Sequence, residues 1–249
     1  MGIFFSQPEE KSEESEESEN ETHQLPPRKF KGNLTVPIVL LYSYIGTGYH
    51  GLQYQDGQKT IEKDLFEAIS NAGLIPPKSY LDKSQTKWSE ASRTDAGVHC
   101  AAQVVSFMAS LQGNLKVRDV APLISKYIPR HSTITVWKAI SFSSKFDAQR
   151  FADGRRYKYL MPLHAFKEQT DEHLQYIREN VLPRFVGKKN FHNYTKRVNP
   201  SSPSNERTIW NFDISEPFKV IGEKYVLWTI HGQSFMLNQI RKMLATVLA

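Results

Sequence analysis

One short stretch of the sequence combines residue types that could do chemistry. SRTDAGVHC, at residues 92–100, places a guanidinium and a carboxylate two residues apart, just before a glycine turn. Arg93 and Asp95 can lie on one side of an extended or turning backbone, and a neighbouring cation favours the ionised carboxylate. An ionised Asp95 would suit a nucleophile or base at neutral pH. A surface turn with an incidental ion pair is the alternative that the local composition leaves open.

The charge of the chain is unevenly distributed. Its net charge is +6, but residues 1–24 hold eight glutamates and one lysine, so residues 25–249 carry +13. Residues 1–33 are expected to form a disordered acidic tail, because glutamate, serine and proline bury too little apolar area to offset the ordering entropy. The basic body favours a polyanionic partner such as nucleic acid, and an aromatic content of 12% offers rings for stacking on unpaired bases. Basic charge alone also fits proteins that bind no nucleic acid.

Several classes of site are not expected. The single cysteine, Cys100, rules out a disulfide framework and multi-cysteine zinc sites, and the eight histidines form no HExxH motif. We therefore expect no metal and no cofactor. The sequence has no apolar run of the roughly 18 residues that a membrane helix needs, so we expect no membrane partner and an intracellular protein.

Residues 34–145 are expected to form a first α+β half that positions Asp95. A strand rich in β-branched and aromatic residues precedes a glycine turn, after which Thr60 can cap a helix that Gly73 can end. Strand and helix then alternate without the long crossovers of a parallel sheet. The other elements expected in this half are strands at 36–44, 104–108 and 133–140 and a helix at 117–127.

Residues 146–249 are expected to form a second α+β half. In its first strand, at 155–160, a period of two places Tyr157 and Tyr159 on one face and Arg156 and Lys158 on the other. The two tyrosines could form a platform for a base, or both rings could belong to the core. Other features expected here are a helix at 168–181 that Pro183 ends, a basic and aromatic RNA-contacting stretch at 188–197, a mobile loop at 198–206 and strands at 208–214 and 225–231.

The last fifteen residues, 235–249, have the pattern of an amphipathic helix. Its apolar stripe comprises Met236, Ile240, Met243, Leu244 and Val247, with Arg241 at the border. A cation at such a border usually has a carboxylate partner, and Asp95 is the candidate. The sequence ends in mid-helix without a cap or breaker, so we expect that it lacks its natural C-terminal portion.

Four motifs, in this order, resemble those of the TruA family of tRNA pseudouridine synthases, especially its eukaryotic branch. The resemblance covers residues 36–249. The motifs are YIGTGYHGLQYQDGQKTIEKDLFEAI for the first strand, glycine turn and helix, SRTDAGVHC for the aspartate signature, RFADGRRYKYLM for the tyrosine strand and FMLNQIRKM for the arginine helix. Departures from the family pattern at Leu52, Ser92 and Cys100 flank these motifs, and they bear on substrate preference more than on chemistry.

The resemblance implies a role for each of four residues. Asp95 would be the nucleophile that helps to break the C1′–N1 glycosidic bond of uridine. Arg93 would help to extrude the target nucleotide and fill its place. Tyr157 would stack on the target base, and Arg241 would hold Asp95 ionised. Whether the aspartate first attacks the sugar or removes a proton from it stays open.

The resemblance also implies an architecture and partners. The family fold has two halves whose antiparallel sheets join into one extended sheet, with helices on one face and the catalytic cleft between the halves. tRNA is the expected partner, other RNAs remain open as substrates, and family members often form homodimers. The nucleus is the first expectation for localisation, with the mitochondrion and cytoplasm as alternatives.

Two other functions compete with a pseudouridine synthase. One is a catalytically silent RNA-binding or RNA-folding protein on the same scaffold, against which the presence of all four site residues argues. The other is a glycosidase that uses Asp95, which lacks a clear second carboxylate near the motif.

Overall fold

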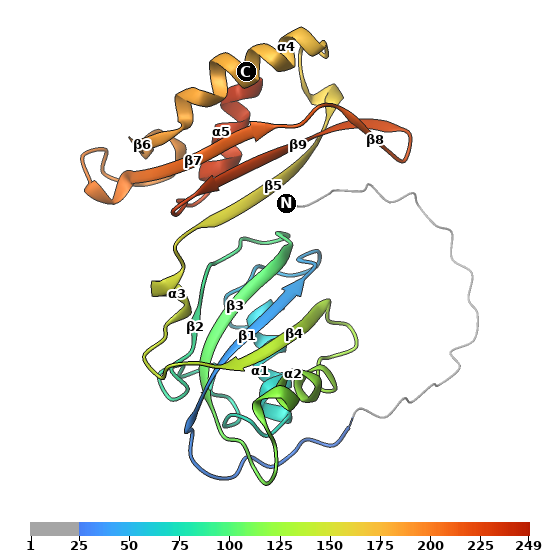
Figure 1. Ribbon diagram of the computed structural model, residues 1–249, viewed down its shortest axis with the longest axis vertical. Coiled ribbons are helices and arrows are strands. Elements are labelled where there is room, and N and C mark those ends of the chain that lie inside the picture. The colour runs from blue at the N-terminus through green and yellow to red at the C-terminus, as the bar shows by residue number, and fades with distance from the viewer. Residues whose placement is uncertain (1–24) are drawn as a thin grey trace. The chain divides into compact units, whose positions relative to one another are not determined.

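The computed structural model describes residues 25–249, which divide into two compact units, one ending at Ala152 and one beginning at Asp153 (Figure 1). Both units combine helices with an antiparallel sheet, so the fold is α+β, as the sequence predicts. The first 24 residues of the expected acidic tail lie outside the described residues. Within the described part, no helix has the length and hydropathy needed to cross a membrane.

The first unit contains a four-stranded antiparallel sheet with strand order β2-β3-β1-β4. Alternate residues of β1, among them Ile38, Leu40 and Tyr42, are buried in a core shared with α1 and α2, so these helices cover one face of the sheet (Figure 1). The elements are β1 (Val36–Tyr44), α1 (Ile61–Asn71), β2 (Ser89–Glu90), β3 (Cys100–Ala109), α2 (Val117–Ser125), β4 (Ile134–Ser141) and α3 (Ala148–Phe151).

Local signals determine the ends of α1 as the sequence predicts. The Thr60 hydroxyl accepts a hydrogen bond from the Lys63 N–H at 3.4 Å, which satisfies a donor in the first turn. After the helix, Gly73 adopts a left-handed conformation with φ of 74° that suits glycine. The predicted strands and helices of this unit are confirmed, with small shifts at their ends.

The segment before β1 is attached to the first unit. The Arg28 N–H donates to the Asn71 carbonyl at 2.8 Å, and the Ser110 hydroxyl donates to the Lys31 carbonyl at 2.9 Å. The Tyr127 hydroxyl also donates to the Pro26 carbonyl at 3.3 Å. These residues fall within the range 1–33 expected to be tail, so contacts with the folded unit begin before the first strand.

The second unit contains a five-stranded antiparallel sheet with strand order β5-β9-β7-β6, and β8 pairs with β9. One face carries Phe212, Trp228 and Ile230 into a core that includes Leu174 and Met243 from the helices. The principal elements are β5 (Arg155–Pro162), α4 (Asp171–Tyr176), β6 (Gly187–Asn190), β7 (Glu206–Ile214), β8 (Phe218–Val220), β9 (Glu223–Gly232) and α5 (Gln239–Leu248).

The helix predicted at 168–181 has a different form in the structure. Thr170 caps α4, and the chain continues through a π-helical turn at Ile177–Val181 and a 3-10 turn at Leu182–Phe185. Pro183 therefore lies in the first part of the 3-10 turn, where its missing N–H leaves no hydrogen bond unmade. Burial of Leu182 and Phe185 in the core favours this continuation.

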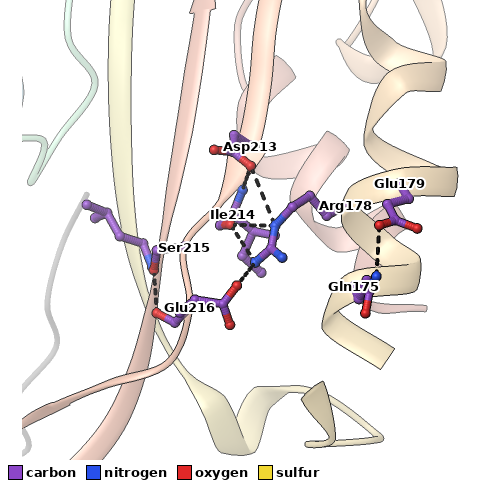
Figure 2. Close-up of polar contacts among 8 residues, drawn as sticks. Gln175, Arg178, Glu179, Asp213, Ile214, Ser215 and Glu216 are labelled. Atoms are coloured by element: carbon purple, nitrogen blue, oxygen red, sulfur yellow. Dashed lines mark hydrogen bonds and ion pairs between the residues drawn. The ribbon is translucent and has the colours of Figure 1, made fainter. Parts of the chain in front are cut away.

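Arg178, in the π-helical turn, attaches this helical segment to the end of β7. Its Nε and Nη2 atoms donate to the Ile214 carbonyl at 3.2 and 3.1 Å, and Nη2 lies 2.8 Å from Glu216 Oε1 (Figure 2). A hydrogen-bonded and charge-paired guanidinium satisfies the last carbonyl of the strand. The contact fixes the helical layer relative to the sheet.

The loop expected to be mobile at 198–206 is organised by Asn205. This side chain is fully buried, and its Nδ2 donates to the carbonyls of Asn199 and Pro200 at 2.7 and 3.3 Å. The Phe191 N–H also donates to the Asn205 carbonyl at 3.0 Å. A buried amide inside a polar stretch therefore ties the loop to the start of β7.

Candidate active site

Asp95 lies in the loop that connects β2 to β3 in the first unit. Its side chain and that of Arg93 are both exposed, and the Val98 N–H donates to the Asp95 carbonyl at 3.2 Å to form a turn. Gly97, inside that turn, has φ of 75°. Among the residues that the structure describes, neither Arg93 nor Asp95 has an ion-pair partner, so the local ion pair considered from the sequence does not form. The turn leaves the carboxylate accessible to a substrate.

The backbone of the Asp95 loop is held by the glycine-rich loop between β1 and α1. The Leu52 N–H donates to the Thr94 carbonyl at 3.1 Å, and the Gly97 N–H donates to the Tyr49 carbonyl at 3.3 Å. A Cβ atom on Gly46 would lie 2.2 Å from the Val98 carbonyl oxygen, too short for a non-bonded contact, so only glycine fits at this position. The backbones of the two loops are therefore in direct contact, and we call this contact the interlock. Through it, the glycine-rich loop holds the Asp95 loop in position.

A buried hydroxyl contact strengthens the same junction. The side-chain oxygens of Tyr44 and Thr94 lie 2.8 Å apart, and the Tyr44 ring is buried beneath the loop. Burial raises the pKa of the Tyr44 phenol well above its ordinary value, so the group stays protonated at neutral pH. The contact connects the end of β1 to the residue that precedes Asp95.

Tyr49 connects the interlocked loops to the body of the unit. Its hydroxyl donates to Asp64 Oδ2 at 2.6 Å and lies 3.0 Å from Ser132 Oγ, while His131 Nε2 lies 3.6 Å from the same carboxylate oxygen. Burial raises the pKa of Tyr49 to about 12, and the hydrogen bond to Asp64 adds to the shift. Sequence analysis missed Tyr49 and Asp64. A carboxylate on the apolar side of an amphipathic helix was the signal that could have revealed the cluster.

Two glutamates of the first unit, one fully and one partly buried, have polar partners inside it. Glu62 is fully buried, accepts from the Tyr54 N–H at 2.6 Å and pairs with Lys83 Nζ at 2.5 Å. Glu90, at the end of β2, accepts from the Tyr42 hydroxyl at 3.3 Å. Burial raises the pKa of Glu90 to about 8, with the nearby charge of Glu62 as the next cause, so Glu90 is mainly neutral at pH 7.

Tyr157 lies in β5 of the second unit. Its half-buried ring packs edge-to-face on Phe235, with ring centroids 5.3 Å apart. Tyr159 packs against the core of this unit, while Arg156 and Lys158 are exposed on the opposite face of the strand. The predicted alternation is confirmed, and Tyr159 follows the core alternative.

Arg241 lies in the first turn of α5 and is exposed. The helix begins at Gln239, later than predicted, because Asn238 adopts a left-handed conformation with φ of 58°. The buried Gln239 side chain accepts from the Met236 N–H at 2.8 Å. The next residue, Lys242, donates to the carbonyls of Asn193 and Thr195, which attaches the helix to the turn after β6.

The four predicted site residues are thus distributed over two units. Arg93 and Asp95 belong to the first unit, and Tyr157 and Arg241 belong to the second. Each pair is described within its own unit, so their union in one site remains a prediction. Across residues 25–249, the structure gathers no group of three side chains that could hold a metal ion.

Comparison with known proteins identifies relatives of this chain. Residues 182–249, which include Arg241, match the family model described as tRNA pseudouridine synthase. The chain is 35% identical to the Pseudouridylate synthase 1 homolog of Mus musculus, over 90% of this chain and 54% of that protein. Identity to the Homo sapiens protein of the same name is 36%, over 85% of this chain and 51% of the relative.

A more distant relative extends the same similarity to fungi. The tRNA pseudouridine synthase 1 of Saccharomyces cerevisiae is 26% identical over 84% of this chain and 53% of its own length. The chain spans about half the length of the curated relatives it matches. The family model and these relatives agree, so the chain is similar to tRNA pseudouridine synthases.

Proposed function

We propose that this chain isomerises uridine to pseudouridine in tRNA, with Asp95 as its catalytic carboxylate. The observation that carries the proposal is the interlocked pair of loops, which holds the backbone around Asp95 while leaving its side chain exposed. A fixed backbone beneath an accessible carboxylate is what a positioned nucleophile requires. Similarity to pseudouridine synthases supplies the reaction.

The proposed reaction needs no external reactant. The bond between C1′ and N1 of the target uridine breaks, the uracil ring turns, and a new bond forms between C1′ and C5. C5 then loses its proton and N1 gains one, so the atoms balance. Positive charge develops at C1′ as the glycosidic bond breaks, and an ionised Asp95 stabilises or captures it. The carboxylate acts either on C1′ or on a sugar proton, and both routes give the same product.

The other three residues have proposed roles around Asp95. Arg93, exposed two residues away, occupies the position from which the target nucleotide is extruded, and it offsets part of the unstacking cost of a few kcal/mol. Tyr157 stacks on the target base, and Arg241 keeps Asp95 ionised. For all four to act together, the two sheets join into one extended sheet with helices on one face and the cleft between the halves.

The proposed partners follow from charge and from the family. Residues 25–249 carry a net charge of +13, which complements the phosphates of tRNA. We also propose other RNAs as further substrates, a homodimer as the assembly and the nucleus as the compartment. The boundaries of the proposed organisation are a tail at 1–33, a catalytic half at 34–145 and a second half at 146–249.

Asp95→Asn tests the proposed function. The variant removes the charge and keeps the size, so we expect it to abolish pseudouridine formation in an unmodified tRNA transcript while tRNA affinity stays within about twofold. Asp56→Asn, at another exposed aspartate in the first unit, is the matched control and should keep full activity. Full activity in Asp95→Asn would refute the assignment. Binding without product in the unaltered chain would favour the silent RNA-binding alternative.

A further inference from the structure

The second unit has one sheet face that its own core does not use. Tyr159, Phe212 and Trp228 point into the core, so the alternate residues of β5, β7 and β9 face the other way. In the strand register, Arg156 of β5 lies opposite His231 of β9, which in turn lies opposite Asn211 of β7. This row of three residues crosses the open face of the sheet.

Trp210 lies beside this row because the pairing of β7 with β9 is irregular. The register shifts between Ile209, which is fully buried, and Asn211, and the residue in between is Trp210. An extra residue in a strand redirects a side chain, and here it leaves the indole 45% exposed. A tryptophan in a central strand would otherwise be expected in the core.

The indole is nevertheless held in place. Its ring meets the His231 ring at 70°, with centroids 4.7 Å apart. A Cβ atom on Gly154 would lie 2.5 Å from Trp210 Cζ3, so the ring lies directly over the backbone of that glycine. Only glycine allows this approach. Trp210 is therefore an exposed ring in a fixed position, supported by β9 and by the residue before β5.

The charges on the same face are partly uncompensated. Lys188 Nζ forms an ion pair with Glu206 Oε2 at 2.8 Å, and Arg178 Nε lies 3.9 Å from Asp213 Oδ1. Arg156 and Lys158 are exposed and have no carboxylate within 4.0 Å among the described residues. The open sheet face that bears Trp210 therefore also carries two exposed cations without a carboxylate partner.

We propose that Trp210, with His231, Arg156 and Lys158, binds an unpaired nucleotide of the RNA substrate at a position other than the target uridine. The base stacks on the exposed indole, and the flanking phosphates contact the two cations. Aromatic rings beside cations are a common way to bind single-stranded RNA with little base preference. The inference rests on the proposed function only in taking RNA as the occupant. In this proposal the ring that acts with Arg156 and Lys158 is Trp210 and not a tyrosine of β5. Tyr157 and Tyr159 lie on the opposite face of that strand.

Trp210→Ala is the first arm of the test, with equilibrium affinity for an unmodified tRNA transcript measured at several salt concentrations. Loss of one stacked base should weaken binding about tenfold, with the salt dependence unchanged. Trp210→Phe keeps a ring and should lose less. Phe218→Ala, at another exposed ring of the same unit, is the control and should bind as the unaltered chain does.

Lys158→Gln and Gly154→Ala separate the two parts of the site. Lys158→Gln removes one phosphate contact, so it should weaken binding and reduce the slope of log affinity against log salt by about 0.7. Gly154→Ala should displace the indole and reproduce the loss of Trp210→Ala without a change in slope. Thermal unfolding of each variant shows whether a loss of binding reflects a loss of fold.

The outcomes distinguish this inference from the proposed function. Unchanged affinity in folded Trp210→Ala would overturn the stacking site, even if the unaltered chain makes pseudouridine. A tenfold loss in Trp210→Ala with no product from the unaltered chain would support the stacking site and refute the isomerase. If Trp210→Ala unfolds, unchanged affinity in both Trp210→Phe and Lys158→Gln would overturn the proposal.

Discussion

The two halves of the predicted site are built in different ways. Around Asp95, backbone hydrogen bonds and close glycine contacts join two loops some 45 residues apart in the sequence, and buried tyrosines attach them to the sheet and α1. Arg241 instead projects, exposed, from the first turn of a helix. The difference teaches that the first unit holds the backbone beneath Asp95 by itself, whereas Arg241 needs a partner outside its own helix to acquire a fixed position.

Gly46→Ala should have the largest effect on the part of the predicted site around Asp95. The new methyl group would lie 2.2 Å from the Val98 carbonyl oxygen, so the two loops must separate. A displacement of about 1 Å at the reacting group can cost about 100-fold in rate, and we expect a loss of at least this size in pseudouridine formation. Gly48→Ala is the control in the same loop, since open space surrounds its new methyl group and only its φ of 77° adds strain. Equal losses in both variants would contradict a steric interlock.

Arg241→Gln should lower the rate of pseudouridine formation without changing the stability of the protein. Because the side chain is exposed, the free energy of unfolding should change by less than about 0.5 kcal/mol. Loss of the cation proposed to stabilise Asp95 should still lower the rate about 100-fold.

The adjacent Lys242→Met should show the opposite behaviour. It removes hydrogen bonds to two carbonyls and should cost about 1 to 2 kcal/mol of stability, with a smaller effect on rate. Rate and stability measured for both variants separate a residue of the site from an anchor of the fold. Comparable rates in the two would remove Arg241 from the site.

Tyr49→Phe should loosen the first half without disrupting it. The variant leaves buried Asp64 with one donor fewer, which should cost about 1 to 3 kcal/mol in the free energy of unfolding. The backbone contacts between the loops remain, so we expect only a several-fold loss of rate. Chemical denaturation and single-turnover kinetics measure the two effects. Tyr54→Phe, whose hydroxyl bonds to exposed Asp56, should change neither.

Glu90→Gln should reveal a pH dependence peculiar to the first unit. Burial, followed by the charge of Glu62, raises the pKa of Glu90 to about 8 in the folded protein, while Lys83, Tyr42 and Trp88 oppose the shift. Between its unfolded pKa and pH 8, the folded state keeps a proton that the unfolded state releases. Stability should therefore fall as pH rises through this window, by up to about 1 kcal/mol per pH unit.

The amide in Glu90→Gln cannot ionise, so the variant should lose this contribution to the pH dependence. Relative to the unaltered chain, its melting temperature should rise progressively between pH 5 and pH 8.5. Melting curves at several pH values measure the effect. A constant difference between the two proteins at all pH values would mean that Glu90 does not titrate in this window.

The comparison also explains which parts of the molecule were predictable from sequence. Strand periodicity and local caps determine β1, α1 and β5, and these were predicted correctly because Thr60 and the alternation around Tyr157 act over a few residues. The start of α5 was not, because it depends on a left-handed Asn238 and a buried Gln239 side chain. Burial of Leu182 and Phe185 likewise carried the helical segment past Pro183.

Within the candidate site, residue types were easier to predict than their supports. Asp95 and Arg93 could be singled out from a nine-residue motif. The interlock could not, because it joins Gly46 and Tyr49 to residues near Val98 through long-range pairing that no local pattern records. The alternative of an incidental ion pair between Arg93 and Asp95 fails for a related reason, since sequence proximity does not determine where two side chains on a turn project.

The central claim is that Asp95 acts in the chemistry and not in binding. Its most direct test is a single-turnover measurement with tRNA tritiated at C5 of uridine and the protein in saturating excess over the RNA, where each isomerisation releases one tritium. The account predicts first-order release by the unaltered chain and none by Asp95→Asn, with equal amounts of RNA bound. Release by Asp95→Asn at the rate of the unaltered chain would contradict it.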